Sequence, residues 1–550
     1  MSIEEPRIGV YICHCGINIG GVVKVPEVVE YAKSLPNVVV AKDYLYTCSS
    51  PGQAMIRGDI KEHKLNRVVV ASCSPRMHEP TFRKVVEEGG LNPYLFEMVN
   101  IREHCSWVHA EEPEKATKKA KDLVRMGVAK ARLLEPLQKK EVAVTVRALV
   151  IGAGVAGMMA ALDLAERGFE VYLVEKAPSI GGRVPQLNKL YPTDENAIGV
   201  IKPIMKAVES NSNIKLFTNT EVTSVEGFIG NYKVKLKVKP RYVSEKCDAC
   251  GMCEIVCPIE APNEFDYNLS KRRAIYMPFR DAIPKRYIID MKSCNKCGEC
   301  IRVCKWGIIN PIEQPQEVEV DIGGIVVAVG HELYDPPQGE FGYRVHRNVI
   351  TMPQLERLLD KNGPTEGELR LSGSPPKSVV FISCVGSRQE PGIYRPLSED
   401  QRLNKYCSRV CCTASIKNAL LIRQRYPDCR VYYLYRDIRA FGRGHEEYYR
   451  KAGENFVYFI KYKAEAPPLV SSSSEGLVVT VQDVLTGNET MLIYADLVVL
   501  GVGMIPRPEA SDIQSILKIP KSADGFFAEA HAKLRPLDTP TEGIFLAGTA

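Results

Sequence analysis

Two runs of four cysteines in the middle of the chain have the spacing of an iron–sulfur protein. Each run reads C-x2-C-x2-C-x3-C. In ferredoxins with this spacing, three thiolates of one run bind one [4Fe–4S] cluster, and the fourth reaches across to the other cluster. The eight cysteines therefore form two crossed sets, Cys247, Cys250, Cys253 and Cys304 for one cluster and Cys294, Cys297, Cys300 and Cys257 for its partner.

Zinc is the alternative metal for these cysteines. Zinc ribbons share the C-x2-C element, but a structural zinc ion needs only four ligands. The first run is complete and is closed by Pro258, as in bacterial ferredoxins. The second run is also complete, with Lys305 in place of the usual proline. The two runs together favour iron over zinc.

A glycine-rich turn predicts a dinucleotide site earlier in the chain. Gly152, Gly154 and Gly157 form the pattern G-x-G-x-x-G between an apolar strand and a helix. Glycines at these positions permit a tight turn and a close approach of a pyrophosphate to the helix N-terminus. Glu175 ends the next predicted strand, where an acidic residue can bind a ribose hydroxyl.

Further residues favour FAD over NAD as the dinucleotide. A Gly-Gly-Arg sequence at 181–183 follows the acid, as in flavoproteins with two dinucleotide domains. The end of the chain, with Gly548 before Thr549, is similar to the last FAD-domain strand of such proteins, although many have an aspartate after that glycine. The residues predicted to contact FAD are Gly152, Gly154, Gly157, Glu175, Lys176, Gly182, Arg183, Gly330 and Gly548.

Four cysteines near the end of the chain predict a third cluster. Cys384 follows an apolar strand at the place where an NAD(P)H-binding domain would have a second glycine-rich turn. Cys407, Cys411 and Cys412 lie around a helix start, and residues 407 and 411 would share a face if that helix began early. A strand end and a helix start meet in a βαβ unit, and the helix dipole favours thiolates there. Idle buried thiols, or a Cys411–Cys412 disulfide in a redox sensor, are the alternatives.

Five cysteines near the N-terminus each follow a predicted strand. The strands are expected at 8–12, 38–41, 67–71 and 94–99, in an α/β unit closed by a helix near 111–134. The carboxyl ends of parallel strands share one edge of a sheet. A further cluster and inert core thiols both remain open for this group, which consists of Cys13, Cys15, Cys48, Cys73 and Cys105.

The elements that must position these residues indicate an α/β protein with two dinucleotide-type domains. An apolar run from Val318 to Gly330 predicts a single strand that resumes the FAD domain after the cysteine block. The cysteine block is therefore an inserted bacterial-type ferredoxin domain. The expected segments are an N-terminal α/β domain at 1–140, FAD-domain parts at 141–238, 316–376 and 506–550, the ferredoxin insert at 239–315, and a second nucleotide-domain-like unit without the NAD(P)H fingerprint at 377–505.

Composition limits the cellular setting and the partners. The 550 residues include 72 Lys and Arg and 66 Asp and Glu, a net charge of +6 spread without a basic tract. This charge distribution does not indicate nucleic-acid binding, whereas an acidic protein such as a ferredoxin is a compatible partner. Neither a secretory signal nor a membrane span is recognisable, so the 18 cysteines are expected in the reducing cytoplasm as metal ligands or redox groups.

Taken together, these motifs resemble the A subunits of the heterodisulfide reductases of methanogens and their bacterial relatives. The similarity covers essentially all 550 residues. Besides the flavin turn and the insert, it is carried by Y-I-C-H-C at 11–15, S-C-S-P-R at 72–76, N-I-R-E-H-C at 100–105 and Y-C-S-R-V-C-C at 406–412. The resemblance implies a thioredoxin-reductase-like FAD core in an oxidoreductase whose flavin bifurcates electron pairs.

The resemblance also implies partners. It leads us to expect B and C subunits, a hydrogenase or formate dehydrogenase as electron donor, ferredoxin as one acceptor, the CoM-S-S-CoB heterodisulfide as the other, and an oligomer of such complexes. Family members normally continue past the strand at Phe545 into a helix and a second two-cluster ferredoxin domain. Because this sequence ends at Ala550, we expect either that the chain is truncated or that this relay is absent. The alternatives are an NAD(P)H-linked iron–sulfur flavin oxidoreductase and a non-catalytic electron-relay protein.

Overall fold

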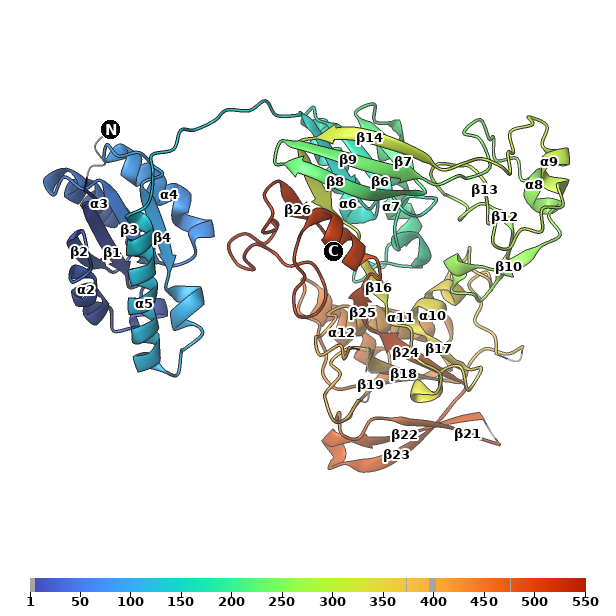
Figure 1. Ribbon diagram of the computed structural model, residues 1–550. Coiled ribbons are helices and arrows are strands. Elements are labelled where there is room, and N and C mark those ends of the chain that lie inside the picture. Colours follow the sequence, from blue (N-terminus) through green and yellow to red (C-terminus); the bar gives the residue numbers. More distant parts are fainter. Residues whose placement is uncertain (1–4, 372, 395–401, 475) are drawn as a thin grey trace. The chain divides into compact units, whose positions relative to one another are not determined.

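The computed structural model describes residues 5–371, 373–394, 402–474 and 476–550. The chain divides into two compact units, Met1–Val142 and Ala143–Ala550. Figure 1 labels many of their helices and strands. In the part of the chain that is described, no helix is both long enough and apolar enough to cross a membrane.

The first unit is a parallel four-stranded sheet in the order β2-β1-β3-β4, with helices on both faces (Figure 1). Helices α2 and α5 pack on one face, and α3 and α4 on the other. The central strands β1 and β3 are buried along almost their whole length because both faces are covered, whereas the edge strand β2 also carries Lys42 and Asp43. The elements are β1 (Ile8–Cys13), α1 (Ile17–Gly20), α2 (Val25–Lys33), β2 (Val38–Tyr44), α3 (Ser50–Glu62), β3 (Arg67–Ser72), α4 (Pro75–Glu88), β4 (Phe96–Asn100), η1 (Arg102–Ser106) and α5 (Pro113–Ala131).

The second unit begins with the glycine-rich turn, which lies in a parallel sheet of order β26-β15-β5-β6-β7. Helices α6 and α7 cover one face of this sheet, and the antiparallel sheet β14-β9-β8 and α13 cover the other. The elements of this flavin-binding part are β5 (Arg147–Ile151), α6 (Val155–Glu166), β6 (Glu170–Glu175), η2 (Val184–Gln186), α7 (Ala197–Ser210), β7 (Ile214–Thr218), β8 (Thr220–Phe228), β9 (Asn231–Val238), β14 (Gln316–Ile322), β15 (Gly324–Val327), α13 (Ala510–Leu517) and β26 (Ile544–Leu546).

The apolar run from Val318 to Gly330 is two strands, so the prediction of one strand was wrong. β14 pairs antiparallel with β9, whereas β15 pairs parallel with β5 and β26. The chain changes sheet at Gly323, where a Cβ atom would lie 2.1 Å from the carbonyl oxygen of Thr145. β14 (QEVEVDI) alternates polar and apolar residues, whereas β15 (GIVV) has no polar side chain. The change of pattern and the two glycines at 323–324 mark the break, which the interpretation as one apolar run overlooked.

A second parallel sheet, in the order β17-β24-β18-β19-β20, forms the second nucleotide-domain-like part. Helices α10 to α12 cover one face, and the β21-β22-β23 meander covers the other. The elements are β16 (His331–Leu333), η4 (Glu340–Gly342), β17 (Val349–Thr351), α10 (Met352–Leu359), β18 (Ser378–Val385), α11 (Cys411–Arg425), β19 (Arg430–Tyr435), α12 (His445–Glu454), β20 (Val457–Lys461), β21 (Leu469–Ser473), β22 (Gly476–Asp483), η5 (Val484–Thr486), β23 (Glu489–Ala495), β24 (Leu497–Val502) and β25 (Met504–Pro506).

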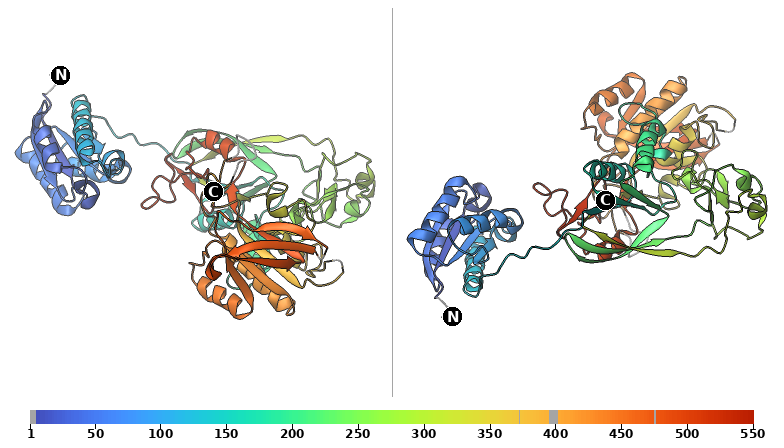
Figure 2. Two further views of the ribbon diagram at one scale, coloured as in Figure 1. Left: turned by 90° about the horizontal axis from the view of Figure 1, so that it is seen from below. Right: turned by 90° about the horizontal axis from the view of Figure 1, so that it is seen from above.

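The cysteine block forms a small lobe, light green in Figure 2, that extends from the second unit. Cysteines make up a large share of its buried and half-buried apolar side chains. So small a core gives little stability without bound metal, and we expect the clusters to hold this lobe together. The elements are α8 (Met252–Ile255), β10 (Glu260–Pro262), η3 (Glu264–Asp266), β11 (Lys271–Arg273), β12 (Ile275–Tyr276), β13 (Ile288–Ile289) and α9 (Glu299–Val303).

A buried ion pair joins the flavin-binding part to the second sheet. The Glu356 carboxylate on α10 accepts hydrogen bonds from the Lys417 ammonium on α11 and from the backbone N–H of Asn188. Lys417 also donates to the carbonyl oxygen of Lys189, at 2.7 Å. The Lys417 and Glu356 side chains are only 4% and 1% exposed. The 188–189 segment, α10 and α11 are therefore fixed to one another by buried charge.

Lys417→Met is expected to lower the free energy of unfolding by about 3–5 kcal/mol, because it leaves the Glu356 carboxylate buried without its cation. Urea unfolding of the anaerobic protein would measure the shift. Lys202→Met is the matched control, since the Lys202–Asp281 pair has side chains that are 44% and 23% exposed. We expect less than about 1 kcal/mol there. Equal shifts in the two variants would show that burial of the pair does not matter.

Candidate functional site

The ferredoxin-like lobe contains two separate cavities lined by cysteines. The first is lined by Cys247, Cys250, Cys253 and Cys304. The second is lined by Cys257, Cys294, Cys297 and Cys300. Each run of the sequence thus contributes three cysteines to one cavity and one to the other, the same crossed sets that the spacing predicts.

The two runs fold alike because each turns at the same points. Gly251 and Gly298 have φ of +86° and +81°, a left-handed conformation that suits glycine. The backbone N–H of Ala249 donates to the Cys247 sulfur at 3.4 Å. In the second run, the N–H two residues after Cys294 donates to that sulfur at 3.3 Å. Such N–H···S contacts stabilise thiolates and tune the potential of a cluster.

The chemistry of the two cavities fits iron–sulfur clusters. Every ligand candidate is a sulfur atom, and Ile259, Ile275 and Ile289 are among the apolar residues of the second cavity. Burial, followed by negative charge on Cys247, raises the pKa of Cys253 to about 12. Several thiolates crowded together are stable only beside a cation, which iron supplies.

The glycine-rich turn leaves no room for side chains at two of its three glycines. A Cβ atom on Gly157 would lie 1.9 Å from the carbonyl oxygen of Gly152. Gly152 has φ of +102°, and a Cβ atom there would lie 2.4 Å from the carbonyl oxygen of Ala328. At Gly154 the nearest atom is the Gly182 Cα, at 3.9 Å. The space beside Gly154, at the N-terminus of α6, is open for a ligand.

The other predicted FAD residues lie around the same turn. The Glu175 carboxylate accepts hydrogen bonds from the backbone N–H groups of Ala153 (2.7 Å) and Ala177 (2.8 Å). Burial raises the pKa of Glu175 despite these bonds. A Cβ atom on Gly548 would lie 2.9 Å from the Ala156 Cβ, in the first turn of α6. Closely packed glycines with an acidic residue beneath the turn are the features expected of a dinucleotide-binding site.

The remaining three predicted FAD residues complete the outer part of this site. Lys176 pairs with Glu509 and lies 3.6 Å from Glu221. Gly330, with φ of +70°, follows the end of β15. Arg183 pairs with Glu332.

Residues that the sequence did not single out lie beside Arg183. Its Nε donates to the carbonyl oxygen of His331 at 3.3 Å, and its Nη1 lies 3.5 Å from the hydroxyl of Tyr267. His331 Nδ1 lies 2.9 Å from the hydroxyl of Thr549, the residue that stands where many flavoproteins have aspartate. Burial, followed by the charge of Arg183, lowers the pKa of His331 to about 4. His331 follows Gly330 directly, whereas Tyr267, from the insert, has no signal in the sequence.

Comparisons with known proteins agree with this geometry. The profile of an NAD(P)-binding Rossmann-like domain matches residues 150–195, and that of a 4Fe-4S dicluster domain matches residues 246–308. The chain is 53% identical to the second iron–sulfur A subunit of CoB–CoM heterodisulfide reductase from Methanopyrus kandleri, over 100% of this chain and 82% of that protein. The chain belongs to the family of heterodisulfide reductase A subunits.

A second relative has almost the same degree of similarity. The chain is 52% identical to the A subunit of the H(2):CoB-CoM heterodisulfide,ferredoxin reductase of Methanothermobacter marburgensis, over 100% of this chain and 82% of that protein. Among solved structures, thioredoxin reductase of Lactococcus lactis aligns with a TM-score of 0.38 at 14% identity, over 73% of this chain and 89% of that chain. The family and the two domain matches support FAD and [4Fe–4S] clusters as the cofactors of an oxidoreductase.

This family member brings its four late cysteines together. α11 begins at Cys411, so Cys407 lies outside the helix and the expected shared helix face does not form. A hydrogen bond with Cys412 raises the pKa of Cys411, and burial and negative charge on Cys384 and Cys407 raise it further. The same bond lowers the pKa of Cys412 to about 6. Cys411 and Cys412 are therefore in direct contact at the start of α11, and Cys384 and Cys407 lie near enough for their charges to act on Cys411.

Four of the five N-terminal cysteines also converge. The Cys13 sulfur accepts a hydrogen bond from the backbone N–H of Cys15, at 3.3 Å. A hydrogen bond from Cys73, and then Arg102, lower the pKa of Cys15 to about 6, with Arg102 Nη1 3.4 Å from the sulfur. Burial, followed by charge on Cys13 and Cys15, raises the pKa of Cys48. These thiols gather at the carboxyl edge of the first sheet.

Cys105 does not belong to this group. It is fully buried, and its thiol donates to the carbonyl oxygen of Ala116 on α5, at 3.1 Å. Burial raises its pKa, and Lys119 is the charged neighbour that acts on it. Cys105 lies in the turn η1 after β4 and points into the core, so it serves packing.

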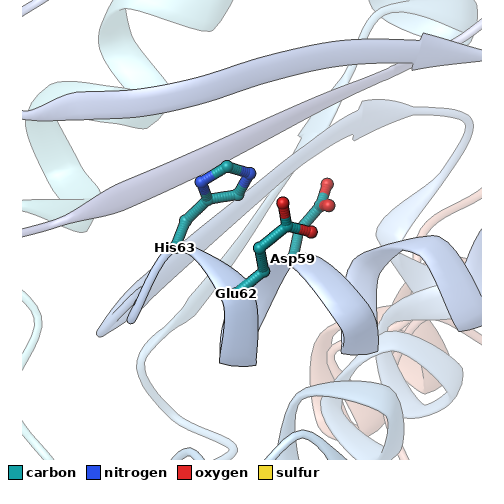
Figure 3. Close-up of side chains that lie close together, drawn as sticks. All are labelled: Asp59, Glu62 and His63. Atoms are coloured by element: carbon teal, nitrogen blue, oxygen red, sulfur yellow. The ribbon is translucent and has the colours of Figure 1, made fainter.

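Asp59, Glu62 and His63 form a different cluster at the end of α3. Figure 3 shows the carboxylates of Asp59 and Glu62 facing each other, with the His63 ring beside them. Their ligand atoms lie within 4.8 Å of one another. Asp59 already accepts hydrogen bonds from the Tyr11 hydroxyl (3.2 Å) and the Lys42 ammonium (2.7 Å). Because the Lys42 charge already compensates Asp59, we assign no metal ion to this trio.

Proposed function

We propose that this chain is the FAD- and cluster-carrying component of a heterodisulfide reductase. It passes electrons from a hydrogenase or formate dehydrogenase to ferredoxin and, through partner subunits, to the CoM-S-S-CoB heterodisulfide. The observation that carries this proposal is the 53% identity to the Methanopyrus kandleri protein over the full chain. The name of the Methanothermobacter marburgensis relative, which joins H2, heterodisulfide and ferredoxin, supports the bifurcating form of the reaction.

The residues of the turn are proposed to hold FAD. Bound FAD supplies a carrier that accepts an electron pair and releases electrons singly. The N-terminus of α6 and the open space at Gly154 bind the pyrophosphate, and Glu175 binds a ribose hydroxyl. Gly182, Gly330 and Gly548 allow the chain to approach the cofactor closely. Lys176 and Arg183 complete the outer part of the site, where each also pairs with a glutamate.

The cysteines are proposed to form the electron routes. The two crossed sets of the insert hold two [4Fe–4S] clusters. Cys384, Cys407, Cys411 and Cys412 hold a third cluster, for which the helix N-terminus and the low pKa of Cys412 are favourable. A fourth cluster is proposed at Cys13, Cys15, Cys48 and Cys73. Arg102 next to Cys15 would compensate the negative charge of that cluster.

The partners in this proposal follow from the family. Heterodisulfide reductase B and C subunits carry electrons to the heterodisulfide, and the net charge of +6 suits an acidic ferredoxin. We also propose a cytoplasmic location, where thiols remain reduced, and an oligomer of complete complexes.

Anaerobic purification followed by counting iron, sulfide and flavin tests the proposal. About eight irons per FAD are expected from the insert alone, and about twelve or sixteen if the third and fourth clusters form. A protein without flavin, or with zinc in the insert, would contradict the proposal. Rapid flavin reduction by NAD(P)H would instead favour the NAD(P)H-linked oxidoreductase.

A further inference from the structure

One loop of the insert, residues 263–270, reaches the FAD site. The Gln186 side chain on η2 donates to the carbonyl oxygen of Phe265 at 3.0 Å and accepts from the Tyr267 hydroxyl at 3.2 Å. The same hydroxyl lies 3.5 Å from Arg183 Nη1. Arg183 and Gln186 belong to the segment that directly follows Gly182. The loop therefore contacts the segment that lines the proposed flavin pocket.

Tyr267 is held in an unusual backbone conformation. Its φ is +50°, in the left-handed region that non-glycine residues seldom adopt. Such a conformation persists only where surrounding contacts enforce it, and it is common at functional sites. The contacts come from inside the loop, where Asp266 accepts hydrogen bonds from Asn263 (3.0 Å) and Ser270 (2.6 Å).

Arg357 on α10 holds the loop from the other side. Its Nε donates to Asp266 at 2.8 Å, and its Nη1 donates to Asp360, also at 2.8 Å. The guanidinium lies over the Phe265 ring, 4.8 Å from the centroid. The Arg357 residue is 1% exposed. A planar guanidinium with two buried carboxylates and an aromatic face permits essentially one orientation of the loop.

Helix α10 is itself fixed to the flavin-binding part. Glu356, the residue before Arg357, binds Lys417 and the backbone N–H of Asn188. The loop thus lies at a junction of the insert, the segment after Gly182 and α10. Buried ion pairs add little stability relative to apolar packing, but they can specify orientation. The placement of this pair between modules indicates that orientation is its role.

We propose that Arg357 and Asp266 are positioning residues that fix the insert against the FAD site and so set the rate of electron transfer between flavin and insert. The inference rests on the cofactors of the proposed function. Each transfer removes one electron from reduced FAD and converts one [4Fe–4S]2+ cluster to [4Fe–4S]+, with no further reactant. Because electron tunnelling slows steeply with distance, a fixed loop keeps this step fast and uniform.

Arg357→Met and Asp266→Asn, in the full chain purified anaerobically, test the proposal with two measurements. Hydrogen exchange should become faster at the backbone amides of 263–270. Internal electron transfer after flash photoreduction of the flavin should slow several-fold, since the tunnelling rate falls exponentially as the distance between flavin and cluster increases. Iron and flavin contents and cluster midpoint potentials should equal those of the wild type, and Arg357→Lys should partly restore the rate.

Arg344→Met is the matched control, because the Arg344–Asp335 pair (2.8 Å) has side chains that are 53% and 63% exposed. It should change neither measurement. A wild-type transfer rate in Arg357→Met, with full iron and flavin, would overturn the proposal.

If the Arg357→Met variant loses iron or flavin, the Tyr267→Phe variant tests the proposal in its place. It removes only the hydroxyl that binds Gln186. Slower transfer in that variant supports the proposal, and an unchanged rate overturns it. Failure of the wild-type flavin to reduce any cluster would contradict the proposed function instead.

Discussion

Cys257→Ala is expected to remove the cluster of the second cysteine run, about four irons per chain, and to leave the cluster of its own run in place. The reason is the crossed arrangement: Cys257 follows Cys253 in sequence but lines the cavity of Cys294, Cys297 and Cys300. Without Cys257 that cluster has three thiolates. Iron and acid-labile sulfide per chain, with the EPR spectrum of the reduced protein, measure the loss.

Double variants identify which cluster is lost. Cys257→Ala combined with Cys294→Ala should lose no more iron than either single variant, because both remove ligands of one cluster. Cys257→Ala combined with Cys247→Ala should lose about eight irons. Cys429→Ala is the control, since Cys429 is buried and its thiol donates to a backbone carbonyl at 3.6 Å. The opposite pattern in the double variants would mean that each run binds its own cluster.

Cysteine spacing could predict the grouping within the insert because the contacts involved are mostly local. Three ligands of each cavity lie within seven residues of one another, and the backbone turns at Gly251 and Gly298 follow from residue type. The flavin turn is similar, because its strand, glycines and helix are consecutive. Short-range patterns of this kind determine local geometry before any distant contact forms.

Contacts between distant segments could not be predicted in this way. Asp266 and Arg357 are far apart in the sequence, and neither stands in a recognisable motif. Tyr267 lies in the insert but contacts Gln186 in the flavin-binding part. Only tertiary packing distinguishes these cases.

The N-terminal cysteines show how far a topological rule extends. Parallel strands place their carboxyl ends at one edge, and four cysteines follow this rule. Cys105 also comes after a strand, yet the η1 turn directs it into the core beneath α5. The direction of a side chain after a strand depends on one or two backbone torsions, which the strand pattern does not specify.

Gly154→Ala is expected to fold normally and to lose FAD. Gly154 has φ of −74°, which alanine adopts readily. A Cβ atom there would meet only the Gly182 Cα, at 3.9 Å, an ordinary contact. The added methyl group would instead occupy the space proposed for the pyrophosphate. We expect FAD affinity to fall on the order of 100-fold, about 2.7 kcal/mol, as measured by fluorescence titration of the flavin-free protein.

Substitutions at two other glycines distinguish a loss of FAD binding from a loss of folding. Gly157→Ala should destabilise the flavin-binding part by several kcal/mol, because its Cβ atom would lie 1.9 Å from the Gly152 carbonyl oxygen. Gly453→Ala, on α12 with nothing within 4 Å, should keep both fold and flavin. If Gly154→Ala bound FAD as tightly as the wild type, the pyrophosphate could not lie at the N-terminus of α6. The flavin would then have to bind elsewhere, and the open space at the N-terminus of α6 would have to bind a different ligand. Gly154 decides this, because close approach of a ligand at that glycine distinguishes a ligand-binding turn from a turn that is filled by packing.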